Sequence, residues 1–427
     1  MFNLITRNSQ FRISAVLMTL VTLLLLLVAM TFVQATTETF RLTATDADAN
    51  DLFSASLAIS GSTVVIGAYQ NDDDGSDSGS VYIFDCSNGC VQTDKLTASD
   101  AAMNDRFGFS VAISGPVVAV GAYYDDDGGR DSGSVYIFDC ADLTACVQTD
   151  KLVASDAEAD DYFGYSVAVS GSIVVVGVYN YEGDASDLGG AYVFDCSDLT
   201  ACVQTDKLLA SDTKASDLFG FSVAISGDMV IAGAFGDDDY GRFSGSAYVF
   251  DCANLGACIE TDKLTASDAT ANDYFGFSVA ISGNVAVVGA YGVSDSGSCS
   301  GSAYVFDCSS LGACNETSKL TASDTAMNDW FGYSVAVSGS TVVAGAYRND
   351  SAGDDNIGAA YVFDCSSGAC VQTDKLTASD AMASDYLGRA VAISGGAVVA
   401  GTNMNDDDGN NSGAAYVFML IPPADGG

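Results

Sequence analysis

The chain has 427 residues, of which 56 are acidic, 15 are basic and none is histidine, so its formal net charge is −41. This charge excludes nucleic acid as a partner, because a polyanion would be repelled, and it favours cations or basic and neutral surfaces. The absence of histidine removes the usual base of serine and cysteine hydrolases and the commonest zinc ligand. Hydrophobic residues make up 48% of the chain, which is enough for a large folded core.

Residues 1–35 have the composition of a targeting segment. Arg7 and Arg12 precede an apolar run over residues 13–33, and small residues follow at 33–35. This pattern predicts a secretory signal peptide. The apolar run is also nearly long enough to span a bilayer, so an uncleaved signal anchor in the membrane is the alternative. Both interpretations place Thr36 and the residues after it outside the cytosol, secreted or at the cell surface.

Seven copies of one sequence unit follow. Their anchor residues are separated by 54 residues once and by 56 residues five times: Phe53, Phe107, Phe163, Phe219, Phe275, Phe331 and Leu387. In the fifth unit, four short stretches rich in Val, Ile, Tyr or Phe predict strands at 275–282, 285–291, 302–307 and 316–321. No stretch has helical periodicity. Four antiparallel strands repeated seven times predict an all-β, seven-bladed β-propeller.

The two ends of the repeat array complement each other. Residues 38–43 resemble a fourth strand, whereas the last unit stops after its third strand at Phe418. We therefore expect the N-terminal strand to complete the last blade, which removes an open sheet edge. The propeller is predicted over residues 36–418, and the Pro-rich tail 419–427 is predicted to be unstructured.

Twelve of the 13 cysteines form close pairs at one position of the repeat. Each pair brackets three to five residues between two predicted strands, where disulfide geometry is reachable, and zinc is disfavoured without histidine or a Cys-x2-Cys motif. The six predicted disulfides are Cys86–Cys90, Cys140–Cys146, Cys196–Cys202, Cys252–Cys258, Cys308–Cys314 and Cys365–Cys370. Cys299 is left over, either as a free thiol or as a link to a second chain.

Two classes of loop carry most of the acidic residues. In an up-and-down blade, the loop between strands two and three and the connection to the next blade emerge on the same face, and the disulfide hairpins lie on the opposite face. The first class carries acidic triplets in units one, two, four and seven: Asp72, Asp73, Asp74, Asp125, Asp126, Asp127, Asp237, Asp238, Asp239, Asp406, Asp407 and Asp408. Because ring closure makes units seven, one and two neighbours, we expect one continuous acidic arc that binds a partner or a metal.

These loops leave two questions of chemistry open. Oxygen ligands with Gly at the bend suit Ca²⁺, but no loop has the EF-hand ligand order, and solvated acidic turns are the alternative. The connections between blades carry a regular Asp pair, such as Asp100 with Asp105, that could act as the acid and base of a glycosidase. The pair occurs in all seven units, whereas catalysis needs one asymmetric site, so hydrogen bonds to turn backbone are the favoured interpretation.

The repeated aromatic residues admit two interpretations as well. Phe109, Tyr165, Phe221, Phe277 and Tyr333 could stack on sugars, but their spacing follows the fold, which favours packing in the blade cores. The single tryptophan, Trp330, stands where other units carry Arg106 or Tyr162 and is a candidate contact residue. Three sequons would accept glycans in a eukaryotic host, at Asn315, Asn349 and Asn410.

The repeat itself resembles a known family. Phe-Gly-Phe-Ser-Val-Ala followed by Val-Val-Gly-Ala-Tyr is similar to the FG-GAP repeat, the unit of the integrin alpha-chain propeller, over residues 38–418. Tyr69 and Tyr123 replace the integrin Pro, and a Ser114-Gly115 turn replaces the Asp-rich integrin loop, so the integrin calcium sites do not carry over. The resemblance implies a monomeric, extracellular, non-catalytic recognition or adhesion module for a protein or glycan. The alternatives are a polysaccharide-active enzyme that uses Asp residues and a structural surface or wall protein.

Overall fold

The computed structural model describes residues 36–179, 188–350 and 356–420. The chain divides into two units, Met1–Thr36 and Thr37–Gly427. The predicted signal peptide or anchor and residues 421–427 of the predicted tail lie outside the described residues. In the described ranges, no helix has the length and apolarity needed to cross a membrane.

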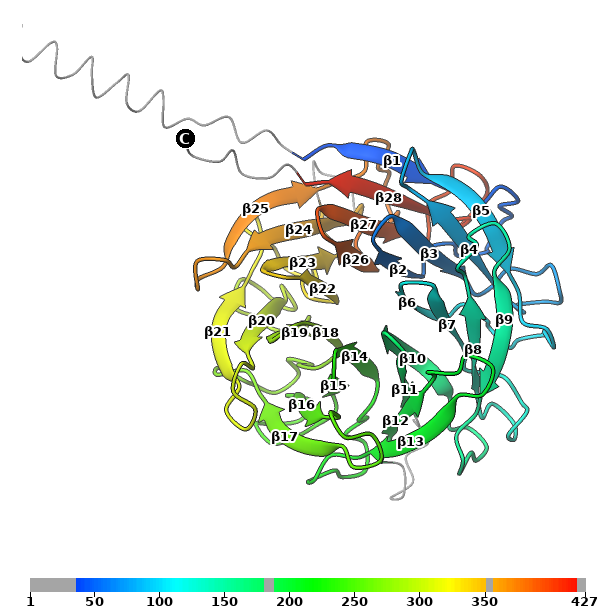
Figure 1. Ribbon diagram of the computed structural model, residues 1–427. Coiled ribbons are helices and arrows are strands. Elements are labelled where there is room, and N and C mark those ends of the chain that lie inside the picture. The colour runs from blue at the N-terminus through cyan, green and yellow to red at the C-terminus, as the bar shows by residue number, and fades with distance from the viewer. Residues whose placement is uncertain (1–35, 180–187, 351–355, 421–427) are drawn as a thin grey trace, which may run out of the picture. The chain divides into compact units, whose positions relative to one another are not determined.

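The described residues of unit Thr37–Gly427 form seven sheets of four antiparallel strands, arranged around a centre (Figure 1). Blade 1 contains β2 (Ser56–Ser60), β3 (Thr63–Ala68), β4 (Ser80–Asp85) and β5 (Val91–Leu96). Blade 2 contains β6 (Ser110–Ser114), β7 (Val117–Ala122), β8 (Ser134–Asp139) and β9 (Val147–Leu152). Blade 3 contains β10 (Phe163–Ser170), β11 (Ile173–Val178), β12 (Gly190–Asp195) and β13 (Val203–Leu208). Blade 4 contains β14 (Ser222–Ser226), β15 (Met229–Ala234), β16 (Ser246–Asp251) and β17 (Ile259–Leu264).

The remaining blades repeat this order. Blade 5 contains β18 (Ser278–Ser282), β19 (Val285–Ala290), β20 (Ser302–Asp307) and β21 (Asn315–Leu320). Blade 6 contains β22 (Ser334–Ser338), β23 (Thr341–Ala346), β24 (Ala359–Asp364) and β25 (Val371–Leu376). Blade 7 contains β26 (Val391–Ser394), β27 (Ala397–Thr402), β28 (Ala414–Met419) and, from the other end of the repeat array, β1 (Glu38–Leu42).

Strand composition follows position in the blade. The second strands, such as β19, are almost continuous runs of small and β-branched apolar residues, because they are buried on both faces. The fourth strands, such as β17, end on a buried Leu264 but carry polar residues before it, because they form the outer edge of the blade.

The N-terminal strand closes the ring, as the sequence predicts. β1 pairs antiparallel with β28, with Arg41 opposite Tyr416 and Leu42 opposite Ala415. The innermost strands of neighbouring blades contact one another all the way around, including β2 of blade 1 with β26 of blade 7. β28 ends at Met419, one residue beyond the predicted boundary of the propeller.

The hydrophobic core consists of seven clusters, each between two neighbouring blades. In one cluster, Phe107 packs against Tyr136 and Phe138 of blade 2, with ring centroids 5.4 and 6.0 Å apart, and against Val81 and Leu96 of blade 1. The other anchor residues repeat this packing, and Leu387 replaces the aromatic ring in the cluster between blades 6 and 7. The repeated anchor is therefore the residue that joins one blade to the next.

The two faces of the ring differ as predicted. All six predicted disulfides are formed. Their hairpins lie beside the turns between first and second strands; for example, the Cys140 amide donates to the Pro116 carbonyl oxygen at 2.8 Å. The loops between second and third strands lie on the opposite face with the connections between blades. We call this second face the acidic-loop face.

Candidate functional site

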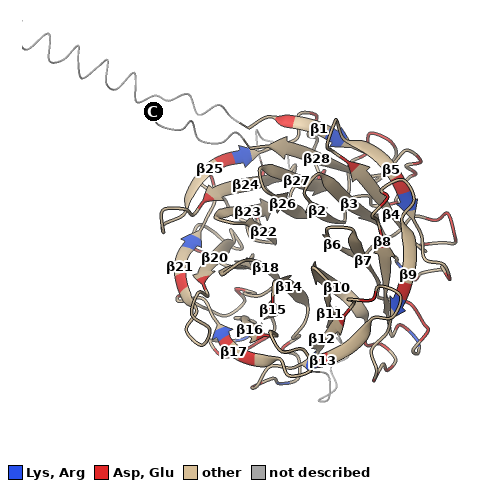
Figure 2. Ribbon diagram, viewed as in Figure 1, with Lys and Arg blue, Asp and Glu red and all other residues tan. Residues whose placement is uncertain are grey.

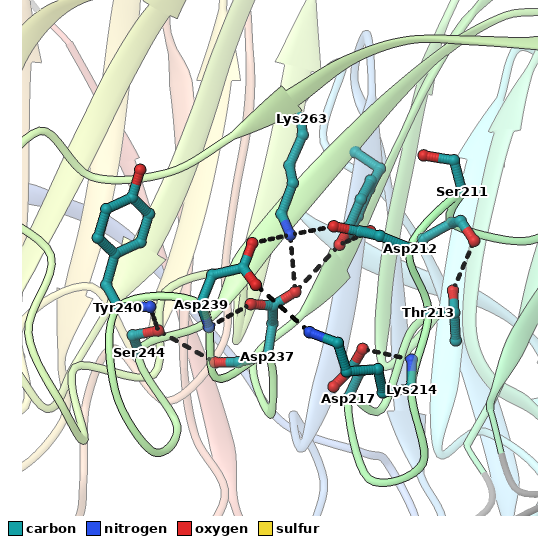
Figure 3. A network of polar contacts seen from close by, with 12 residues as sticks. Ser211, Asp212, Thr213, Lys214, Asp217, Asp237, Asp239, Tyr240, Ser244 and Lys263 are labelled. Atoms are coloured by element: carbon teal, nitrogen blue, oxygen red, sulfur yellow. Dashed lines mark hydrogen bonds and ion pairs between the residues drawn. The ribbon is translucent and has the colours of Figure 1, made fainter.

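The acidic-loop face is built from one polar network that is repeated in the blades. Figure 3 shows it in blade 4, where the Lys263 ammonium donates to Asp212 at 2.7 Å, to Asp237 at 2.9 Å and to Asp239 at 2.6 Å. The Tyr248 hydroxyl donates to Asp212 at 2.8 Å and to Asp237 at 3.1 Å. The lysine extends from the outer strand β17, and the three carboxylates come from two loops, so the network joins loops to the sheet.

Every blade has a cation at the position of Lys263. Lys151 of blade 2 contacts Asp100, Asp125 and Asp127 at 2.7, 3.0 and 2.6 Å. The other cations pair with at least the Asp from the connection between blades: Lys95, Lys207, Lys319 and Lys375, with Arg41 of β1 in blade 7. Figure 2 shows these cations on the outermost strands, next to acidic positions. These cations are absent from the site predicted from the sequence, although one basic residue recurs just before the last Leu of each fourth strand.

The ion pairs shift the ionisation of both partners. Burial opposes the charge on Lys263, but the hydrogen bonds that its ammonium donates to Asp212, Asp239 and Asp237 outweigh burial and raise the lysine pKa. Burial likewise opposes the charge on Asp212, but the hydrogen bonds from Lys263 and Tyr248 outweigh it and lower the pKa of that carboxyl. Lys263 and Asp212 are therefore both ionised at neutral pH, and the cation neutralises part of the acidic charge.

The twelve predicted Asp residues occupy four different environments, because the triplets are not in structural register. Asp125 and Asp237 are buried, 4% and 1% exposed. At the next position the carboxylate caps its own loop; for example, an Asp126 carboxylate oxygen accepts from the Asp131 amide at 2.7 Å. The residues at this position are Asp72, Asp126, Asp238 and Asp406. The third position pairs with the blade cation and is held by Asp73, Asp127, Asp239 and Asp407. Only Asp74 and Asp408 lie one residue further, exposed at the loop tip.

The structure thus revises the predicted uniform acidic arc. Blades 7, 1 and 2 are neighbours as expected, and their loops remain rich in exposed carboxylates. Most of these carboxylates stabilise the loops or pair with a lysine or arginine, which the sequence alone does not show. The carboxylates of Asp74 and Asp408 are exposed at the loop tips, and Asp408 also lies 3.5 Å from the Arg41 guanidinium.

Among the described residues, two groups of three carboxylates could hold a metal ion. They are Asp100, Asp125 and Asp127 in blade 2, and Asp212, Asp237 and Asp239 in blade 4, and the ligand atoms of each group lie within 4.8 Å of one another. Oxygen ligands of this kind suit hard divalent cations. In both groups, however, a lysine ammonium already donates to all three carboxylates, so an ion would have to displace Lys151 or Lys263.

The second Asp of each regular pair stabilises the connection between blades. The Asp105 carboxylate accepts from the Ala102 amide at 2.7 Å, and burial together with the nearby Asp125 charge raises the Asp105 pKa to about 6. Asp217 has the same environment beside Asp237, and its pKa is also raised to about 6. In blade 1 the corresponding neighbour is Asn71, which donates to Asp51 at 3.2 Å instead of repelling it. The backbone contacts agree with the predicted turn-stabilising role.

The predicted core position of the repeated aromatic residues is wrong. Phe109, Tyr165, Phe221, Phe277 and Tyr333 are half-buried and belong to none of the core clusters. Four of them directly precede an innermost strand and Tyr165 is the third residue of β10. Successive rings contact one another from blade to blade with centroids 4.8–5.0 Å apart. A second set follows the second strands and packs on the first: Tyr69, Tyr123, Tyr179, Phe235, Tyr291 and Tyr347. We call these two sets the central aromatic ring.

The residues just before the anchors have a strained backbone. Seven side chains larger than alanine adopt positive φ between 54° and 63° there: Leu52, Arg106, Tyr162, Leu218, Tyr274, Trp330 and Tyr386. Such residues are genuine outliers in this conformation, and strain of this kind persists only where the surroundings enforce it. Several of them extend the central aromatic ring, including Tyr274, which stacks on Tyr291 at 5.0 Å, and Trp330, which lies 4.9 Å from Tyr291.

The predicted glycan acceptors differ in accessibility. Asn315 and Asn410 are exposed. Asn349 is 3% exposed, and its side chain donates to Asp329 and accepts from Lys375, so the folded structure contradicts a glycan at this position. Cys299 is a half-buried free thiol.

Comparison with known proteins supports the repeat and the fold. The FG-GAP repeat profile matches seven segments: 36–84, 90–138, 146–194, 202–250, 259–306, 314–363 and 370–418. No curated protein matches the chain. Among solved structures, a chain of the crystal structure of a mitotic checkpoint complex is similar with a TM-score of 0.54, 14% identity, and coverage of 90% of this chain and 95% of that chain. At that identity the likeness concerns the fold alone.

Proposed function

Because the chain belongs to the FG-GAP repeat family, we propose that it is an extracellular, non-catalytic recognition or adhesion module that binds a protein or a glycan through its acidic-loop face. The propeller presents loops from all seven blades on this face while the sheets hold them in place. The predicted targeting segment and the six disulfides support an oxidising, extracellular location.

One observation carries the choice of this face. An open groove of about 470 Å³ lies at blade 1 and its connection to blade 2, and Asp74, Ser99 and Asp100 are among its lining residues. Asp74 is one of the two loop-tip carboxylates, and Asp408 belongs to the neighbouring blade 7. A basic or neutral partner would find there exposed acceptors on a rigid frame, with the charge of the chain steering its approach.

Repetition argues for binding rather than turnover. Asp105 and Asp217 have raised pKa values of about 6, as a general acid would need. Both carboxylates accept backbone hydrogen bonds that recur in other blades, for example from the Met382 amide to Asp385. A residue with the same role in several blades supplies no asymmetric acid and base pair.

Calcium assistance is the finer part of this proposal, and the two carboxylate groups in blades 2 and 4 are its sites. The ion would replace the lysine ammonium there, so calcium binding and the ion pairs compete. Thermal melts of the chain from Thr36 in excess calcium and in chelator test this part. A higher melting temperature in calcium supports it, and coincident melts remove calcium from the proposal.

The face itself is tested by capture. The chain from Thr36 is immobilised and exposed to native extracellular material, as the wild type and as a variant with Asp74→Asn and Asp408→Asn. Asp142→Asn, an exposed change in a disulfide hairpin on the opposite face, is the matched control. We expect the double variant to lose bound partner and the control to retain it. Equal capture by all three proteins would place the interface elsewhere.

A further inference from the structure

The central aromatic ring is interrupted where blades 7 and 1 meet. The position of Phe109 is occupied by Ala55 in blade 1 and by Arg389 in blade 7, and the position of Tyr123 is occupied by Asn403 in blade 7. Blades 2 to 6 have an aromatic residue at both positions. The break therefore replaces three rings with a methyl group, a guanidinium and an amide. It lies at the acidic-loop end of the inner strands, because Ala55 directly precedes β2, Arg389 lies two residues before β26, and Asn403 directly follows β27.

Asn403 has an unusual environment for a polar side chain. It is 1% exposed, and neither its amide nitrogen nor its amide oxygen hydrogen-bonds to any described residue. Buried polar groups are nearly always paired in folded proteins, and an exception calls for an explanation. A ligand group that both accepts and donates hydrogen bonds would satisfy this amide.

Three arginines surround the break. Arg106 lies over Tyr69 and Tyr124, with the guanidinium 5.8 and 4.6 Å from the ring centroids. Arg348 lies over Trp330 at 4.0 Å. The charge of Arg389 acts on Tyr69 of blade 1 and on Tyr347 of blade 6. Burial raises the pKa of both tyrosines, and the positive charge of Arg389 opposes this rise in each.

These arginines have no carboxylate partner, although the chain is strongly acidic. None of the three forms an ion pair within the described part of the chain, and the Nε atoms of Arg106 and Arg348 are buried without a hydrogen-bond acceptor. Every blade cation on the outer strands, by contrast, pairs with at least one Asp. Guanidinium groups held on aromatic faces remain charged and bind carboxylate or sulfate in two-point contacts.

We propose that Ala55, Arg106, Arg389 and Asn403 form an anion-binding subsite for the charged end of a glycan, a terminal sugar that carries one carboxylate or sulfate. The guanidinium groups take the anion, the Asn403 amide bonds a sugar hydroxyl, and the rings that continue from the break, such as Phe109, offer faces for stacking. The surrounding acidic loops repel long polyanions, so a single terminal charge fits this surface better than a uniformly charged polymer. This assignment rests on the proposed recognition function and concerns its glycan alternative: the arginines at the break would hold the anionic end of the ligand, and the acidic loops would meet its basic or neutral parts.

The test compares singly charged and neutral sugars by calorimetry and saturation-transfer NMR on the chain from Thr36. The probes are lactose capped with glucuronic acid, lactose capped with N-acetylneuraminic acid, sulfated lactose and unmodified lactose. We expect at least one charged probe to bind about tenfold or more tightly than lactose, the worth of one hydrogen bond to a charged group. The carboxylated and sulfated probes distinguish the two sources of the anion.

Two variants separate the subsite from folding. Arg389→Gln removes one charge, and the triple change Ala55→Phe, Arg389→Phe and Asn403→Tyr completes the aromatic ring in the pattern of blades 2 to 6. Both should lose the preference for charged sugars, and the triple variant should fold because it repeats a packing that five blades already contain. Arg242→Gln is the matched control, because Arg242 lies over Phe243 outside the break.

The outcomes are decisive in each direction. Equal binding of all four probes, no binding of any charged probe at millimolar concentration, or unchanged binding by Arg389→Gln would overturn the subsite. Tighter binding of a peptide with a free terminal carboxylate would overturn the assignment to glycans. The two proposals can fail separately. Loss of partner capture by the loop-tip variants with intact sugar binding would support the loop-tip interface independently of the anion subsite, and loss of charged-sugar binding with intact partner capture would overturn the subsite alone.

Discussion

Removing the Lys263 ammonium tests whether the acidic loops depend on the blade cations. In the variant Lys263→Met, the carboxylates of Asp212, Asp237 and Asp239 would remain within 4.8 Å of one another, and the exposed Lys214, 3.4 Å from Asp239, would be the nearest remaining counter-charge among the described ion pairs. At an effective dielectric constant of ~20, each pair of charges at that distance repels by about 3.5 kcal/mol. Water screens Asp212 and Asp239, which are 42% and 36% exposed, so the three repulsions do not add in full.

We therefore expect Lys263→Met to lower the free energy of unfolding by about 3 kcal/mol at pH 7, as when one partner of a buried ion pair is removed. The assay is denaturant unfolding of the chain from Thr36, followed by circular dichroism. Lys214→Met is the matched control, because Lys214 is 63% exposed and reaches only Asp239, at 3.4 Å. Its loss should be below about 0.5 kcal/mol.

The same variant has a pH signature. In the wild type, Lys263 lowers the pKa of Asp212 and Asp239, so this stabilisation is present above their unfolded pKa and is lost as the pH falls through the folded value. In Lys263→Met, mutual repulsion raises the carboxyl pKa values, so acid relieves the strain. The difference between the two proteins should narrow as the pH falls from 7 to 4. Equal unfolding midpoints at pH 7, or equal losses in both lysine variants, would refute the reasoning.

Three further predictions concern the disulfides, the Asp pairs and the contact between blades. Reduction should lower stability by about 2 kcal/mol per short hairpin loop, and identical melts with and without reductant would show that the disulfides do not stabilise the fold. Asp125→Asn should flatten the pH dependence of stability, because the Asp125 charge helps to raise the Asp105 pKa to about 6, above its usual 3.8. The Asp105 contribution to stability falls as the pH rises between those values, so melts at pH 4.5 and 7 should show a smaller fall in the variant, and an equal fall in both proteins would contradict this coupling. Gly79→Ala should destabilise the chain by about 3 kcal/mol or more, because an added Cβ would lie 2.0 Å from the Phe107 carbonyl oxygen. Gly115→Ala is the control, because Gly115 has open space around it and the change should cost only about 1 kcal/mol. Equal unfolding midpoints for the two variants would contradict this contact between blades.

The sequence by itself determined the architecture. The recurrence of the anchor from Phe53 to Leu387, with four strand patterns per unit, specifies seven blades because each unit can bury its apolar surface only against the next. The lone fourth strand at residues 38–42 and the missing fourth strand after β28 specify the closure. Paired cysteines at one repeat position specify the disulfides, because hairpin geometry brings such neighbours together.

Only the tertiary structure decided what the polar and aromatic residues do. Asp72 and Asp125 each begin a similar triplet in the sequence, but one caps a loop and the other is buried beneath a lysine, because a register difference of one residue changes the environment. The partners of Lys263 lie 24 to 51 residues away, and the contact of Phe109 with Tyr165 joins different blades, so no local pattern reveals them. Local periodicity encodes the strands and their burial. The ion pairs and ring contacts instead join residues from distant parts of the chain, which become neighbours only when the ring of blades closes.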